Sequence, residues 1–119
     1  MPKGSKMMNI QIFGVKKCFD TQKAERYFKE RKIKYQFVDL KLKEISKGEL
    51  QSIKSEIGIN NLINSKSKEY KKLNIESIRS SDIKEEILLS NPKLYITPIV
   101  RNGKLATVGY EPLVWDKWE

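Results

Sequence analysis

The stretch from residue 9 to residue 40 most constrains the fold, because it carries a strand, a helix and a second strand in quick succession. Residues 9–13 are typical of a short buried strand, and residues 34–40 alternate like a second one. Between them a helix should begin just after Cys18, with Asp20 or Thr21 as its N-cap residue. This spacing predicts a βαβ unit with a right-handed crossover.

The middle of the chain is predicted to be helical. Ser46 and Glu49 form a capping box in front of one helix, and Gly58 should end it. A shorter helical segment and a further helix should follow, the latter beginning at residues 80–82 and ending at Asn91 and Pro92. The apolar positions expected to face the core of these three segments are Leu50, Ile53 and Ile57, then Leu62, Ile63, Tyr70 and Leu73, then Ile83, Ile87 and Leu88.

The last third of the chain returns to strands. Residues 98–101 and 105–108 flank Asn102 and Gly103, a dipeptide that favours a type I′ hairpin turn. Pro112 should then open a short helix whose apolar residues, Leu113, Trp115 and Trp118, cover the sheet. The order of elements predicts an α/β chain with a thioredoxin-like fold: a βαβ unit, a helical insertion, a β-hairpin and a C-terminal helix around a mixed four-stranded sheet. We expect residues 1–8 to be a flexible leader and residues 9–119 to form a single domain.

Charge and composition exclude several classes of function. The 24 basic and 15 acidic residues give a net charge of +9, but lysines and glutamates interleave along the predicted helices, as on a solvated surface, which argues against a specific nucleic-acid site. The absence of histidine removes the usual general base and most zinc sites. No apolar run is long enough to cross a membrane, and a single cysteine fits a reducing cytoplasm.

Cys18 is the candidate reactive group. A cysteine just before a helix start feels the partial positive charge of the unpaired N–H groups there, which favours the thiolate. Lys16 and Lys17 lie directly upstream, and their charges would act in the same direction. Two alternatives stand beside this interpretation: Cys18 as a small buried hydrophobic residue, and the lysines as ordinary surface residues.

Three blocks of the sequence resemble the arsenate reductase and Spx family. They are residues 12–18 with Lys23 and Ala24, residues 64–73, and residues 97–100 with 108–110. The resemblance implies that Cys18 is the catalytic or redox thiol and that Pro98 is a cis proline packed against it. In this family, glutathione-linked arsenate reductases attack arsenate through the cysteine and release arsenite by way of a mixed disulfide. The Spx regulators use a Cys-x-x-Cys redox switch and bind RNA polymerase.

The chain departs from the family pattern at three positions. Thr21 occupies the place of the second cysteine, so an intramolecular Spx switch is absent. Thr97 occupies the place of an arginine before the proline, and Lys66, or Asn64 in a shifted register, occupies that of another arginine. Neither threonine nor lysine offers the two-pronged donor with which arginine grips an oxyanion, which argues against arsenate reduction by the family route. Arg101 is a possible substitute, but as a hairpin residue it should face solvent.

The leading hypothesis is a thiol oxidoreductase that uses a single cysteine. Cys18 would form a sulfenic acid or a mixed disulfide with glutathione or another low-molecular-weight thiol, and an external thiol would recycle it. No bound cofactor or metal is expected, and the substrate would be a small thiol or an oxyanion. The residues expected to bind it are Lys16, Lys17, Thr21, Lys66, Thr97 and Pro98. The alternatives are a non-catalytic adaptor that docks on RNA polymerase, as Spx does, and a relative with neither activity.

Overall fold

A four-stranded mixed sheet forms the centre of one half of the molecule. The computed structural model describes residues 9–118. Its strands, in the spatial order β2-β1-β3-β4, are β1 (Ile10–Gly14), β2 (Tyr35–Asp39), β3 (Ile99–Asn102) and β4 (Leu105–Val108). β1 pairs with β2 in parallel, whereas β3 runs antiparallel to both β1 and β4. The predicted βαβ unit, hairpin and mixed four-stranded sheet are confirmed, and the predicted leader, residues 1–8, lies outside the described residues.

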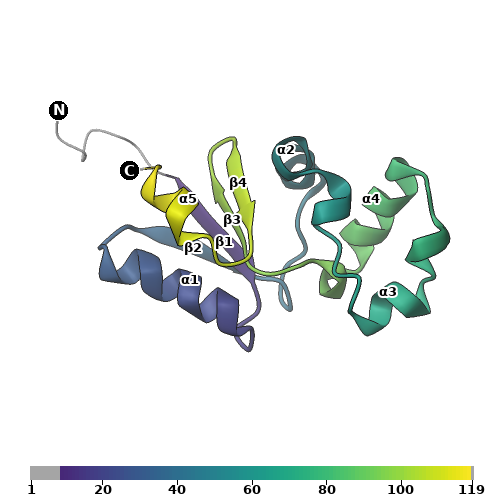
Figure 1. Ribbon diagram of the computed structural model, residues 1–119, viewed down its shortest axis with the longest axis horizontal. Helices are drawn as coiled ribbons and strands as arrows, with labels where there is room; N and C mark the ends of the chain where they lie inside the picture. The colour runs from purple at the N-terminus through teal and green to yellow at the C-terminus, as the bar shows by residue number, and fades with distance from the viewer. Residues whose placement is uncertain (1–8, 119) are drawn as a thin grey trace.

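The helices divide between the sheet and a separate helical lobe (Figure 1). α1 (Phe19–Glu30) and the single-turn α5 (Pro112–Asp116) lie beside the sheet, whereas α3 (Lys68–Lys72) and α4 (Ser81–Ser90) lie at the other end of the molecule. The third helix of the lobe, α2 (Lys47–Ile57), lies between them and also contacts β4. Three 3₁₀ segments connect this lobe: η2 (Ile59–Asn61), η3 (Ile75–Ser77) and η4 (Pro92–Leu94). The result is an elongated molecule of 50 × 27 × 24 Å. Residues 9–118 contain no helix of the length and apolarity that a membrane span requires.

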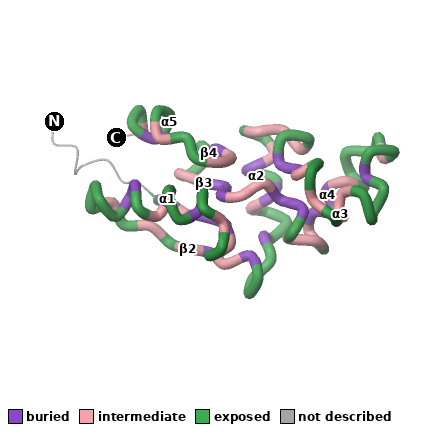
Figure 2. The backbone as a smooth tube through the Cα atoms, turned by 60° about the horizontal axis from the view of Figure 1, so that its bottom comes forward, coloured by how far each residue is buried: buried purple, intermediate pink, exposed green. Residues whose placement is uncertain are grey.

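Two separate hydrophobic cores hold these parts together, and buried segments are found in both halves of Figure 2. We call the first the aromatic core, because Tyr27, Phe28 and Trp115 dominate it; its other buried members are Ile10, Ile12, Ala24 and Val100. We call the second the aliphatic core; it joins the end of the sheet to the helical lobe. Its buried members are Phe13, Val38, Leu40, Ile45, Leu50, Ile53, Leu62, Ile63, Ile75, Leu88, Leu94, Tyr95 and Ile99.

The predicted helix boundaries in the lobe are formed by local hydrogen bonds. The Glu49 N–H donates to Ser46 Oγ over 3.2 Å, and the Ser46 N–H donates to Glu49 Oε1 over 2.9 Å, which completes the capping box of α2. Gly58 ends the helix with a φ of 93°, a backbone conformation that favours glycine. Ser80 caps α4 through its hydroxyl, as the Ile83 N–H donates to it. These capping signals are short-range, which is why the sequence displays them.

The hairpin turn differs from the prediction by one residue. Asn102 belongs to β3 and pairs with Leu105, so that Gly103 and Lys104 form the two-residue loop. Of the two, Gly103 has a positive φ of 61° and Lys104 does not. A positive φ at the first loop position alone is the pattern of a type II′ turn, so the predicted type I′ turn on Asn102 and Gly103 is wrong.

Three residues predicted to face the core are exposed instead: Leu73, Ile83 and Leu113. Leu113 is 77% exposed because α5 turns Trp115 toward the sheet, and a residue two positions earlier points roughly 200° away around the helix. Ile83 is 49% exposed for the same reason, since α4 buries Glu85 and Leu88. The apolar pattern alone favoured a leucine and an isoleucine on the inner face. A buried glutamate, which pairs with Lys54 of α2, takes that face in α4.

Candidate functional site

Cys18 is itself the N-cap residue of α1. The helix begins at Phe19, so the predicted N-cap at Asp20 or Thr21 is wrong, although the cysteine lies at the helix start as expected. Its carbonyl accepts the first helical hydrogen bond from the Gln22 N–H over 3.0 Å, and its own N–H donates to the Val15 carbonyl over 3.0 Å. The Gln22 side chain donates to the Lys16 carbonyl over 2.7 Å. The loop that carries the thiol is therefore fixed at both ends.

Thr97 lies across from the sulfur and contacts it through two atoms. The Thr97 hydroxyl donates to Cys18 Sγ over 3.2 Å, and the thiol lies 3.7 Å from the Thr97 carbonyl oxygen, which can accept its proton. The bond from Thr97 to Pro98 is cis, as the resemblance implied, and Pro98 is buried. Cys18 itself is partly exposed. The structure thus brings Cys18, Thr97 and Pro98 together and leaves the sulfur accessible.

The surroundings lower the pKa of the Cys18 thiol below its ordinary value. Partial burial acts to raise the pKa, and the Thr21 and Thr97 hydroxyls together with the backbone N–H groups of Thr21 and Asp20 outweigh it. Of these groups, the Thr97 hydroxyl donates to the sulfur over 3.2 Å, whereas the Thr21 hydroxyl and the two backbone N–H groups belong to the first turn of α1. The thiolate is therefore favoured by neutral donors and the helix start.

Thr21 is fully buried inside the first turn of α1. Its hydroxyl makes no hydrogen bond of normal geometry within residues 9–118, and it packs tightly over Gly14 at the end of β1. A Cβ atom on residue 14 would lie 2.5 Å from Thr21 Oγ1, so only glycine permits this approach. The contact explains why Thr21 is not the N-cap residue, since packing against the strand draws it into the helix. Gly14 is the residue that sequence reasoning missed here.

The basic residues predicted for the site take other positions. Lys16 and Lys17 are exposed, and their charges are not among the causes of the lowered pKa of Cys18. Lys66 is exposed as well, and its backbone N–H donates to the Asn64 side chain over 3.0 Å. Arg101 lies opposite Gln11 in the sheet, to whose side chain it donates over 3.0 Å. The site that the structure describes is therefore made by neutral donors.

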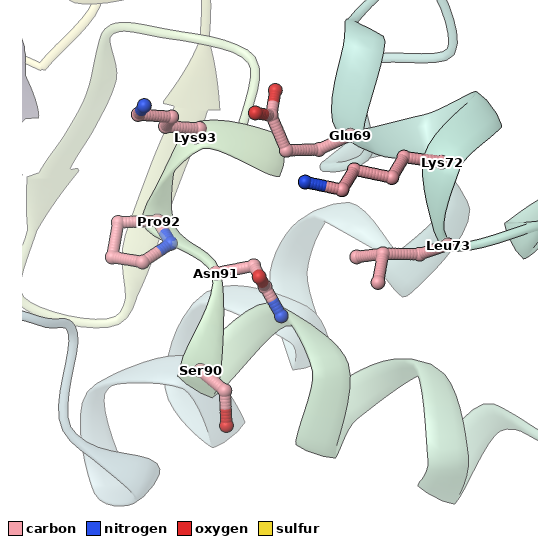
Figure 3. A pocket seen from close by; sticks show the side chains of 7 residues that line it. All are labelled: Glu69, Lys72, Leu73, Ser90, Asn91, Pro92 and Lys93. Carbon is pink, nitrogen blue, oxygen red and sulfur yellow. The ribbon is translucent and has the colours of Figure 1, made fainter.

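A separate hollow of about 330 Å³ lies in the helical lobe between α3 and the turn after α4. Figure 3 shows its lining, which is formed by Glu69, Lys72, Leu73, Ser90, Asn91, Pro92 and Lys93. None of these residues contacts Cys18 in the described hydrogen bonds, and none was predicted to bind substrate. This concavity of the lobe is thus distinct from the thiol site.

Comparisons with known proteins find relatives in both sequence and structure. The chain is 30% identical over 105 residues to the global transcriptional regulator Spx of Staphylococcus aureus and to that of Staphylococcus epidermidis, which covers 85% of this chain and 79% of each relative. The structure of an arsenate reductase from Vibrio cholerae is similar, with a TM-score of 0.84 and 23% identity over 94% of this chain and 98% of that one. An ArsC-family-related protein from Bacteroides fragilis superposes with a TM-score of 0.76 and 21% identity, over 96% and 100% of the two chains.

The two structural neighbours establish the thioredoxin-like fold, and the sequence relatives add the family. The sequence model of the ArsC family matches residues 13–118, a range that runs from the strand before the cysteine to the last described residue. With Cys18 at the start of α1 and a cis Pro98 beside it, the chain is a member of the ArsC family.

Proposed function

We propose that the protein is a thiol oxidoreductase that works through Cys18 alone. The observation that carries the proposal is the position of the sulfur: it caps α1, remains partly exposed, and accepts a hydrogen bond from the Thr97 hydroxyl over 3.2 Å. A thiol whose pKa is lowered in this way is ionised in a larger fraction of molecules at neutral pH, and the thiolate is the nucleophile in disulfide exchange. We place this chemistry in the cytoplasm, where small thiols are kept reduced.

The proposed cycle needs one small disulfide and one external thiol. The Cys18 thiolate attacks one sulfur of glutathione disulfide, or of a comparable small disulfide, forming a mixed disulfide and releasing one glutathione thiolate. An external thiolate then attacks the glutathione sulfur of the mixed disulfide. This step restores the Cys18 thiolate and leaves a disulfide between glutathione and the external thiol. The external thiol is required because the chain contains no second cysteine.

The residue before the cis proline supports exchange between thiols more than oxyanion reduction. Thr97 offers a neutral hydroxyl that already donates to the sulfur, and Arg101 lies further along β3 against Gln11. The two-pronged arginine donors with which the family grips an oxyanion are absent here, and in the described contacts Lys16 and Lys66 do not point charged donors at the sulfur in their place. We therefore propose a thiol or disulfide as the substrate in place of arsenate.

The decisive experiment is a titration of the Cys18 thiol combined with mass spectrometry of its adducts. The alkylation rate should be followed against pH with iodoacetamide, and the protein should then be incubated with glutathione disulfide, cystine and other small disulfides. We expect a pKa below the usual 8.5 and a single glutathione adduct that an external thiol removes. Cys18→Ser is the control that forms no adduct. An ordinary pKa together with no adduct would reject the proposal.

A second candidate function rests on the sequence relatives. Because the curated relatives at 30% identity are global transcriptional regulators, we propose as the alternative a non-catalytic adaptor that docks on RNA polymerase. Such an adaptor should bind the purified polymerase in a salt-sensitive manner, and the binding should persist in Cys18→Ser. If the protein does not retain the polymerase even at low salt, the adaptor hypothesis is rejected. Retention that depends on the thiol would instead point to a redox-controlled interaction.

A further inference from the structure

A surface hollow with basic and aromatic lining lies between α1 and α5, away from the thiol. The hollow is lined on one side by Lys23, Arg26 and Glu30 of α1 and by Arg31 at its C-terminal end, and on the other side by Tyr110 and Pro112; we call it the α1–α5 groove. Its walls are fixed by aromatic contacts, since the rings of Tyr110 and Trp115 meet edge to face at 5.6 Å. Because Trp115 is fully buried in the aromatic core, the groove has a rigid base.

The cations of this groove differ in whether they are already paired. Arg31 stacks over the Tyr27 ring at 3.7 Å and lies 3.9 Å from the Asp116 carboxylate. Lys23 lies 5.7 Å above the Tyr110 ring, and neither Lys23 nor Arg26 has an ion-pair partner among residues 9–118. Two positive charges therefore face the groove without a carboxylate of their own, next to an aromatic ring that is 40% exposed.

Directly after Pro112, which lines the groove, the chain leaves two apolar side chains exposed to water. Leu113 and Val114 follow Pro112 on α5 and are 77% and 39% exposed, respectively. A large apolar side chain that is left in water beside unpaired cations is typical of a surface that a protein partner covers. Lys23 also follows Cys18 by less than two helical turns, so the groove and the thiol site lie along the same helix.

We propose that the α1–α5 groove binds an acidic segment of a partner protein. Carboxylates of the segment meet Lys23 and Arg26, and an apolar side chain of the same segment packs against Tyr110 and Leu113. The net charge of +9 attracts such a segment over a distance, and it disfavours a second copy of this chain as the occupant. The exposed Leu113 next to the groove can pack against an apolar side chain of a protein segment, whereas it gains nothing from the phosphates of a nucleic acid.

The test uses fluorescence anisotropy with two labelled peptides, one of repeated Glu-Asp-Leu units and one of repeated Glu-Asp-Ser units. We expect the leucine peptide to bind more tightly, and Lys23→Glu with Arg26→Glu to raise its Kd about tenfold or more. The matched control is Lys47→Glu with Lys104→Glu, which changes the net charge equally at exposed positions on α2 and the hairpin loop. It should change the Kd far less. Leu113→Ser should weaken binding of the leucine peptide and leave that of the serine peptide unchanged.

Several outcomes would overturn the proposal. Equal losses in the two double variants would mean that bulk charge alone drives binding. A DNA duplex that displaces the leucine peptide at matched charge would assign the groove to nucleic acid. Circular dichroism checks that each variant is folded. If the double variant Lys23→Glu with Arg26→Glu does not fold, Lys23→Gln with Arg26→Gln takes its place. Cys18→Ser should bind the leucine peptide as the unsubstituted protein does, so the groove is tested independently of the proposed thiol chemistry.

Discussion

The aromatic and aliphatic cores differ in how their burial is distributed. In the aromatic core, Trp115 contacts both Tyr27 and Phe28 at ring-centre distances of 5.1 Å, and its indole N–H donates to the Thr107 hydroxyl over 2.8 Å. The aliphatic core spreads its burial over many medium-sized side chains from short elements, and an ion pair between Lys54 and Glu85 joins α2 to α4. The stability of the first therefore depends on a few large residues, and that of the second on many small contributions.

Replacing the central ring of the aromatic core should have the largest effect. We expect Trp115→Ala to lower the free energy of unfolding by about 3 to 5 kcal/mol, because it removes a fully buried ring and one hydrogen bond. Urea unfolding followed by circular dichroism measures this loss. Hydrogen exchange should show that amides of α1 and α5 lose more protection than those of α2. An equal loss of protection in the helices of both cores would contradict the division of the molecule into two cores.

A methyl group at the junction of β1 and α1 should have the next largest effect. Gly14→Ala places a Cβ 2.5 Å from Thr21 Oγ1 and 2.8 Å from Thr21 Cγ2, so we expect a loss of about 1 to 3 kcal/mol. The same unfolding measurement gives the loss, and thiol titration should show an altered pKa for Cys18. Combining Gly14→Ala with Thr21→Ala should recover much of the stability. If the double variant does not recover stability, the close contact with Thr21 is not the cause of the loss in Gly14→Ala.

Removing the cap of α2 should affect only the helical lobe. Ser46→Ala deletes the acceptor for the Glu49 N–H, and we expect a loss of about 1 kcal/mol in the free energy of unfolding. Ser46→Asp, which keeps an acceptor at this position, is the matched control and should remain close to the original stability. If Ser46→Ala speeds hydrogen exchange in α1 as much as in α2, the two cores do not behave as separate units.

The smallest effect concerns the pH dependence of stability at the thiol. Because the pKa of Cys18 is lower in the folded protein than in the unfolded chain, ionisation favours the folded state. This contribution should be complete above the unfolded pKa and should disappear as the pH falls through the folded pKa. The difference in unfolding free energy between the protein and Cys18→Ser should therefore grow with pH. Thr97→Val should reduce that growth, since it removes the hydroxyl donor.

The sequence predicted the elements whose signals are local and missed the contacts between distant segments. The capping box at Ser46, the helix end at Gly58 and the position of Cys18 at a helix start follow from neighbouring residues. The burial of Thr21 against Gly14 was not predictable from spacing, because packing overrode the preference of threonine for an N-cap position. The inward turn of Glu85 depends on Lys54, thirty-one residues away, and no local pattern displays such a partner.

The resemblance supplied what local patterns did not. The cis bond before Pro98 and the pairing of Cys18 with the segment around Thr97 join positions seventy-nine residues apart, and it was the family that pointed to them. The resemblance directed attention to Lys66 and local charge to Lys16 and Lys17, and the structure leaves all three lysines on the surface. Charge was the natural explanation for a reactive thiol from sequence alone. The hydrogen-bond donors that lower the pKa of Cys18 became visible only once the chain was folded.

The segment that faces the sulfur is also the tie between the two halves of the protein. The Ile96 N–H donates to the Leu62 carbonyl in the helical lobe over 2.9 Å, and β3 begins at Ile99, so Thr97 and Pro98 span the passage from lobe to sheet. Any group that bonds to Cys18 Sγ must share or displace the Thr97 hydroxyl. An adduct on the cysteine therefore contacts a segment that leads from the helical lobe into the sheet.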